Sequence, residues 1–199
     1  MAAICHRADL MEKICVARNE ACGVYGFVFF RDGEWVPVVI DDYLFLKALD
    51  FGFGYKGEGT YDPSSKDRLK HRKQKQEGST ALYFGACQDE NETWLPLMQK
   101  AYAKAHGDYH AIDGGCVGEG VEDLTGGVAT RISMEDVLDK KNLWEALLDT
   151  SKEFVFELGL FSGPSDTNNG LARRHAYSII GAREETGEDG KAIRLVKIR

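Results

Sequence analysis

The spacing of apolar residues in the first half of the chain predicts a β-hairpin followed by an amphipathic helix. Residues 24–31 and 35–40 are rich in aromatic and β-branched residues, and a turn-forming Arg-Asp-Gly-Glu sequence separates them. Apolar side chains then recur at helical spacing over residues 92–106, and Gly107 supplies a stop. The apolar positions of residues 2–14 are typical of the tail of a helix.

The second half of the chain predicts a glycine-rich loop, one helix and several strands. Residues 114–127 are expected to form a tight loop that leaves room for one helical turn. Ser133 and Asp136 match a capping box, so we expect a helix to begin there. Its apolar face would comprise Val137, Leu138, Trp144, Leu147 and Leu148. Three strand-like segments follow, at residues 153–161, 175–183 and 192–198.

Residues 51–79 lack a hydrophobic period and are predicted to form an exposed insertion or long loop. Within this insertion, residues 66–75 hold six Lys or Arg and one Asp, which gives the segment a net charge of +5. The simplest interpretation is a solvated charged segment. The alternative is a docking site for an acidic partner.

The composition restricts the class of protein. With 43% hydrophobic and 29% charged residues and no apolar run near the ~20 residues of a membrane span, the pattern predicts a soluble globular chain. The net charge of -7 argues against a general nucleic-acid binder, which needs surplus Lys and Arg. The 5 cysteines are scattered and no secretory pattern occurs, so we expect thiols and an intracellular, cytoplasmic location.

Two motifs that suggest ligands have simpler explanations. Residues 52–57 match the dinucleotide-binding glycine pattern, but the sequence after them contains Gly59 and Pro63 and does not predict the helix that such a site requires. His106, His110 and Cys116 carry zinc-binding groups, yet Gly107 interrupts the helix that would align the two imidazoles. We therefore expect neither a nucleotide nor a zinc site.

His175 is the strongest candidate for a catalytic group. It lies at the start of an apolar strand and follows a glycine-containing loop. An imidazole at a strand end can act as general base for a thiol or hydroxyl nucleophile. The alternative is a histidine with a structural role only.

Five ordered segments of the chain together resemble one known family. They are the hairpin at 23–42, the helix with Lys-Ala-Tyr-Ala-Lys at 94–104, the glycine loop at 122–127, the histidine segment at 170–179 and the strand at 193–199. This series resembles the protease core of the calpain family, papain-like cysteine endopeptidases of two lobes. The resemblance implies an α+β, papain-like fold with residues 1–128 in the first lobe and 129–199 in the second.

The resemblance also implies site residues. The family triad is Cys, His and Asn, and only the histidine carries over, to His175. Gly126 and Gly127 match the loop that borders the substrate, and Arg174 stands where the family usually has glycine, with its carbonyl toward the substrate. The family's cysteine and asparagine segments would fall before Met1 and after Arg199. We therefore expect a core trimmed at both ends and inactive by itself.

By resemblance, the function is that of an intracellular thiol protease that hydrolyses peptide bonds in protein substrates. The alternative is a non-catalytic calpain-like module that binds or regulates protein partners. No cofactor is evident. Calcium would be implied by the family, but His110 stands where a ligating glutamate is expected, and an imidazole suits softer metals. Asp108 and Asp113 are the nearby carboxylates, and we expect this calcium site to be absent or weak.

Overall fold

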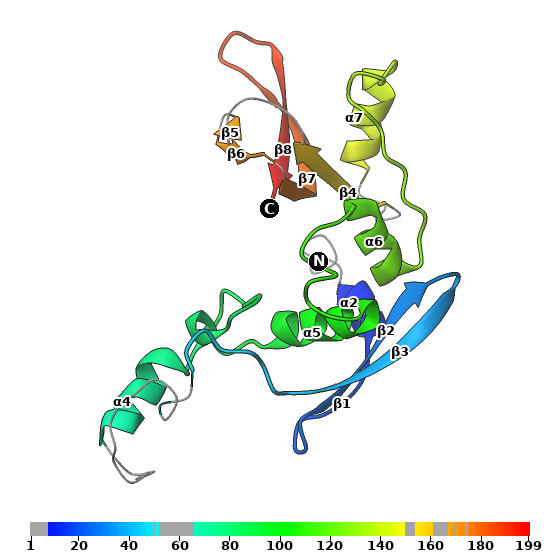
Figure 1. Ribbon diagram of the computed structural model, residues 1–199. Coiled ribbons are helices and arrows are strands. Elements are labelled where there is room, and N and C mark those ends of the chain that lie inside the picture. Colours follow the sequence, from blue (N-terminus) through cyan, green and yellow to red (C-terminus); the bar gives the residue numbers. More distant parts are fainter. Residues whose placement is uncertain are drawn as a thin grey trace. The chain divides into compact units, whose positions relative to one another are not determined.

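Helices and antiparallel sheets are both present, which confirms the α+β class expected from the sequence (Figure 1). The computed structural model describes residues 8–49, 51, 66–149, 154–160, 167–168, 170–173 and 175–199. The chain divides into two compact units, which we call the hairpin unit (residues 15–29 and 36–114) and the C-terminal unit (residues 1–14, 30–35 and 115–199). None of the helices in the described ranges has the length and apolar character needed to cross a bilayer.

The hairpin unit contains a three-stranded sheet in the order β1-β2-β3, except for the turn end of the hairpin at residues 30–35, which is counted with the C-terminal unit. Its elements are β1 (Cys15–Asn19), β2 (Val24–Arg31), β3 (Glu34–Asp41), α4 (Lys66–Lys75), the 3-10 helix η1 (Ser79–Ala81) and α5 (Trp94–His106). The predicted hairpin is confirmed, and its turn explains why the sequence was informative. Asp32 and Gly33 adopt left-handed φ values of 52° and 87°, which the Asp-Gly sequence favours in a two-residue hairpin turn.

Helix α5 packs through its apolar face and is tied to β3 by two lysines. Phe29 of β2 is fully buried, and its ring meets Tyr102 of α5 edge-on with centroids 5.4 Å apart. The Lys100 ammonium donates to the Asp41 carboxylate and to the Tyr43 carbonyl at 2.6 Å, and the Lys104 ammonium donates to the Val39 carbonyl at 2.8 Å. The predicted helix is confirmed, and the chain leaves it at Gly107 with φ 114°.

The basic segment is a helix, so the expectation of a loop there is wrong. Residues Lys66–Lys75 form α4, and none of its side chains is buried, as an exposed insertion requires. The helix lacks an apolar period, which is why the hydrophobic pattern gave no signal. Its Lys, Arg, Gln and Leu residues nevertheless have high helix propensity because their unbranched β-carbons lose little rotamer freedom.

The C-terminal unit contains an antiparallel sheet in the order β4-β7-β8. Its elements are α2 (Ala8–Ile14), α6 (Val117–Thr125), α7 (Lys140–Leu148), β4 (Phe156–Leu160), β5 (Thr167–Asn168), β6 (Leu171–Ala172), β7 (His175–Thr186) and β8 (Ala192–Ile198). The three predicted strands and the described part of the N-terminal helix are confirmed.

Two further predictions for this unit are wrong. Residues 117–125 form the helix α6 rather than a tight loop, because Leu124 is buried and Gly126 ends the helix in a left-handed conformation. Helix α7 begins at Lys140, not near Ser133, because the Asp139 carboxylate accepts hydrogen bonds from two N–H groups of its first turn. Leu138, expected on the apolar face, is 100% exposed.

Candidate active site

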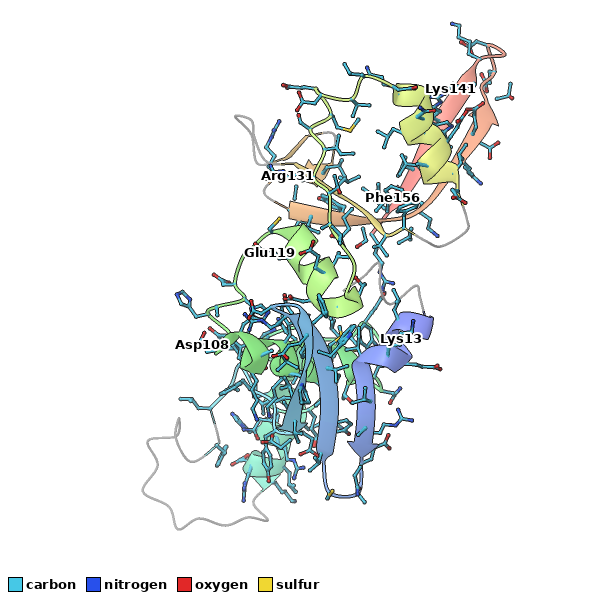
Figure 2. The ribbon with its side chains drawn as sticks, turned by 90° about the vertical axis from the view of Figure 1, so that its right-hand side faces the viewer. Lys13, Asp108, Glu119, Arg131, Lys141 and Phe156 are labelled. Atoms are coloured by element: carbon cyan, nitrogen blue, oxygen red, sulfur yellow. The ribbon has the colours of Figure 1, made fainter. Side chains whose placement is uncertain are left out.

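His175 is the first residue of β7 and its side chain is exposed. In the sheet, His175 pairs with Leu160, the last residue of β4. The first residue of β4, Phe156, is labelled in Figure 2. Its imidazole meets the Tyr177 ring edge-on, with centroids 5.0 Å apart and an interplanar angle of 89°. The sheet therefore fixes the backbone of His175 while the imidazole stays accessible to a reacting group.

Tyr177 also holds the segment that precedes the histidine. Its hydroxyl accepts a hydrogen bond from the backbone N–H of Ala172 at 2.7 Å. Because Ala172 belongs to β6 and Tyr177 to β7, this bond spans the connection in which Arg174 lies. Arg174 itself is outside the described residues. Tyr177 was not singled out from the sequence, although its position two residues after His175 places both side chains on one face of the strand.

The half-buried carboxyl group of Glu157 lies on the other face of this sheet. Ser178 is 6% exposed, and its hydroxyl donates to Glu157 Oε1 at 3.3 Å. Burial raises the pKa of Glu157, and the Ser178 hydrogen bond acts in the opposite direction. Alternate residues of a strand face opposite sides, so the side chain of Ser178 is directed away from the face of His175 and Tyr177. Glu157 therefore lies on the opposite face of the sheet from the His175 imidazole and does not orient it.

Gly126 and Gly127 lie at the C-terminal end of α6. Gly126 has φ 69°, and its N–H donates to the Glu122 carbonyl at 2.8 Å. The Gly127 N–H donates to the Thr125 hydroxyl at 3.1 Å. A side chain at Gly126 would begin 2.9 Å from the Trp35 indole, so the close approach of Trp35 and the left-handed backbone both require glycine.

The predicted site residues are only partly connected by the described contacts. Among the residues that the structure describes, no hydrogen bond or ring contact joins His175 to Gly126 or Gly127. Four cysteines are described, and all are free thiols, namely Cys15, Cys22, Cys87 and Cys116. Burial raises the pKa of the Cys15 thiol, which disfavours the reactive thiolate. Cys5 lies outside the described residues, as does the glycine pattern at 52–57.

The candidate metal ligands are engaged in local structure. The Asp108 carboxylate, labelled in Figure 2, accepts a hydrogen bond from the Ala111 N–H at 2.8 Å. The His106 ring lies against Tyr102 with centroids 4.3 Å apart. Within the described ranges, no group of three His, Cys, Asp or Glu side chains is arranged to hold a metal ion. The weak or absent calcium site remains a prediction.

Comparison with known proteins identifies the class. The chain belongs to the calpain family: the family profile described as "Calpain family cysteine protease" matches residues 1–61 and 66–199. The resemblance noted in the sequence is thereby confirmed, and the family is one of thiol proteases, which are hydrolases.

Individual relatives match over nearly the whole chain. Calpain clp-1 of Caenorhabditis elegans is 33% identical over 187 residues, which cover 89% of this chain and 19% of the relative. Mouse calpain-9 is 31% identical over 184 residues, covering 89% of this chain and 22% of the relative. The calpain-type cysteine protease ADL1 of Oryza sativa subsp. japonica is 30% identical over 207 residues, covering 100% and 8%. The chain thus spans less than a quarter of the length of these relatives.

Proposed function

We propose that this chain is part of the catalytic core of a calpain-type cysteine endopeptidase and that His175 is its general base. The family match supports the reaction class, and the exposed position of His175 at the start of β7 supports the role of the residue. The proposed substrates are proteins. Because the reaction needs a reduced thiol, we place the protein in the cytoplasm.

The proposed mechanism uses the imidazole of His175 as the proton carrier in both formation and hydrolysis of the acyl-enzyme. Its neutral imidazole takes the proton of a cysteine thiol that the proposed full catalytic core supplies, and the thiolate attacks the peptide carbonyl. The imidazolium then donates this proton to the leaving amine as the C–N bond breaks. Water, deprotonated by the same imidazole, hydrolyses the acyl-enzyme. In this scheme the edge-on contact with Tyr177 limits rotation of the imidazole.

The glycine loop is proposed to bind the substrate backbone. Both N–H groups of Gly126 and Gly127 already donate within the end of α6. The loop can therefore offer carbonyl oxygens as acceptors for substrate N–H groups, and its lack of side chains permits a close approach. The Arg174 carbonyl is proposed to act in the same way beside His175.

The second candidate is a non-catalytic calpain-like module that binds protein partners. Arg174 favours it, because the family usually has glycine directly before the histidine and an arginine side chain would crowd the cleft.

Replacing His175 by alanine in the protein that also carries the cysteine and asparagine segments tests the proposal. We expect kcat on a fluorogenic peptide to fall by about 10³-fold or more, because the nucleophile loses its base. His110→Ala, at an exposed loop histidine, is the matched control and should keep the parent rate. Thermal melting of both variants establishes that the fold is intact.

The outcomes separate the two candidates. Parent-like turnover in a folded His175→Ala variant refutes the base. A folded parent protein that neither cleaves peptides nor reacts with an epoxide cysteine-protease probe supports the binding module. The 199-residue chain alone is expected to be inactive, and probe labelling of Cys5 that depends on His175 would contradict this expectation.

A further inference from the structure

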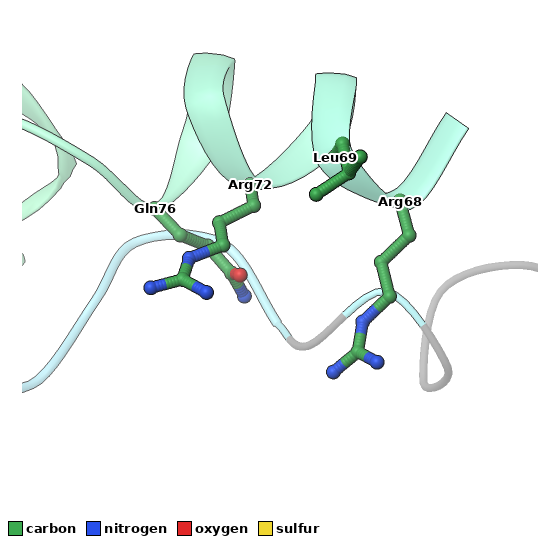
Figure 3. A pocket seen from close by; sticks show the side chains of 4 residues that line it. All are labelled: Arg68, Leu69, Arg72 and Gln76. Carbon is green, nitrogen blue, oxygen red and sulfur yellow. The ribbon is translucent and has the colours of Figure 1, made fainter. Parts of the chain in front are cut away.

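One face of α4 carries two arginines that border a cavity. Arg68 and Arg72 are one helical turn apart, and Gln76 follows one turn later, just beyond the end of the helix. With Leu69, these residues line a cavity of about 370 Å³. Figure 3 shows both guanidinium groups and the Gln76 amide projecting from the same side of the helix. Among the residues that the structure describes, the side chains that line the cavity are two guanidinium groups, one amide and one apolar side chain.

The charge of this face suits an anion. Residues 66–75 carry a net charge of +5 in a chain of net charge -7, so positive charge is concentrated on α4. A guanidinium group presents its N–H donors in a planar fork that matches a carboxylate or phosphoryl group. Arg72 pairs with Glu77 at 3.5 Å, but both side chains are more than half exposed, and such a surface pair is weak enough to exchange for an incoming anion.

The helix is also held in place on the hairpin unit. The Gln76 side-chain amide donates to the Leu49 carbonyl at 3.4 Å, and the His71 ring meets Phe51 edge-on with centroids 5.5 Å apart. These contacts join α4 to the segment that follows β3. A partner would therefore meet two arginines on an ordered support, which lowers the entropic cost of recognition.

We propose that the Arg68–Arg72 face binds an acidic segment of a partner protein, with one carboxylate or phosphoryl group in the cavity between the guanidinium groups. A cavity of about 370 Å³ has room for an acidic side chain together with part of the peptide backbone that carries it. A membrane surface suits it less well, because Leu69 is the one strongly apolar residue of α4 and the helix has no apolar face to insert. The site does not depend on the catalytic proposal.

Fluorescence anisotropy with the 199-residue chain tests the site without any turnover. The probes are a short fluorescein-labelled peptide in which Glu alternates with Gly, its phosphoserine counterpart, and a Gln-for-Glu control peptide. Arg68→Glu with Arg72→Glu should weaken binding of the acidic probe by about 10-fold or more, as expected for lost charge-assisted hydrogen bonds. Comparing the first two probes shows whether carboxylate or phosphoryl groups are preferred.

The matched control is Lys66→Glu with Lys70→Glu, which changes the net charge equally but lies roughly half a turn round the helix. This variant should weaken binding by less than about 3-fold, through screened long-range attraction only. Equal weakening by the two variants overturns the site in favour of general charge attraction. Arg68→Gln with Arg72→Gln, checked by circular dichroism, repeats the test with neutral residues.

Three further results would overturn the proposal. One is the absence of binding of both anionic peptides to the parent chain. Another is a parent chain that binds neither anionic peptide but co-sediments with phosphatidylserine-containing vesicles. If Arg68→Glu with Arg72→Glu abolishes this co-sedimentation, the face binds a membrane rather than a protein. Parent-chain binding of the Gln peptide as tightly as the Glu peptide also contradicts it.

Discussion

The hydroxyl of Tyr177 accepts a hydrogen bond from the Ala172 N–H at 2.7 Å, and its ring lies edge-on to His175. One side chain therefore contacts the proposed base and also secures the chain that leads to it. The position of His175 depends on this tyrosine as well as on strand pairing.

Tyr177→Phe keeps the ring and removes the acceptor of the Ala172 N–H. We expect the free energy of unfolding to fall by about 1 kcal/mol, the usual contribution of such a hydrogen bond. Urea denaturation measures the change. Tyr43→Phe, at a side chain that is 82% exposed, is the control and should be neutral. Equal stability of the Tyr177→Phe variant and the parent would show that this hydrogen bond contributes nothing.

Gly126→Ala should destabilise the C-terminal unit. The new Cβ would combine a left-handed backbone with a 2.9 Å approach to the Trp35 indole, and we expect a loss of about 1–3 kcal/mol. Gly114→Ala, with open space around its Cα, should stay within about 0.5 kcal/mol of the parent. Chemical denaturation of both variants decides the matter, and equal effects would contradict the glycine requirement.

Asp139→Ala removes the side chain that caps α7. Its carboxylate accepts from the N–H groups of Lys141 and Asn142, both at 3.0 Å, and losing such a cap costs about 1 kcal/mol. Ser133→Ala removes the residue that the sequence favoured as the cap and should change stability by less than about 0.5 kcal/mol. Thermal melting of the two variants compares them. A larger loss of stability in Ser133→Ala than in Asp139→Ala would indicate that the helix begins near Ser133.

Glu157→Gln should change how stability depends on pH. Burial raises the pKa of Glu157 in the folded protein, so the unfolded chain loses this proton first as the pH rises. The folded state then binds more protons, and the free energy of unfolding falls with rising pH between the ordinary carboxyl pKa and the raised value. The Gln variant lacks this fall.

Unfolding free energies of the parent and Glu157→Gln, measured across the acidic to neutral range, test this. The advantage of the variant should grow as the pH rises through the window and then level off. Glu135→Gln, at an exposed side chain, is the control. Parallel pH curves for the parent and Glu157→Gln would show that burial does not hold this proton.

The sequence predicts correctly those elements that depend on residues close together in the chain. The Asp-Gly turn predicted the hairpin, and apolar spacing predicted α5, because both depend on neighbouring residues. Helix α4 was missed because propensity without an apolar period gives no such signal. Ser133 and Asp139 can both cap a helix. The helix begins after Asp139 because Trp144 is buried and Leu138 is exposed, and burial depends on the tertiary structure, which the local sequence does not show.

The candidate site was predictable to a similar degree. The position of His175 at a strand end follows from the strand pattern, and its chemical role came from the resemblance. The approach of Trp35 to Gly126 joins residues distant in the chain, so nothing in the local sequence indicates it. The support from Tyr177 could have been inferred from strand periodicity, but the Ala172 contact could not.

The fluorescence of Trp35 can report on the C-terminal end of α6. Its ring is 46% exposed and lies against the backbone of Gly126, whereas Trp144 is 7% exposed. In a Trp94→Phe variant, which removes the third tryptophan, a molecule that covers the glycine loop would shift the Trp35 emission and shield it from acrylamide, while the emission of Trp144 would hardly respond. The protein thus carries an intrinsic fluorophore at the loop proposed to meet the substrate, and binding there can be followed without a label.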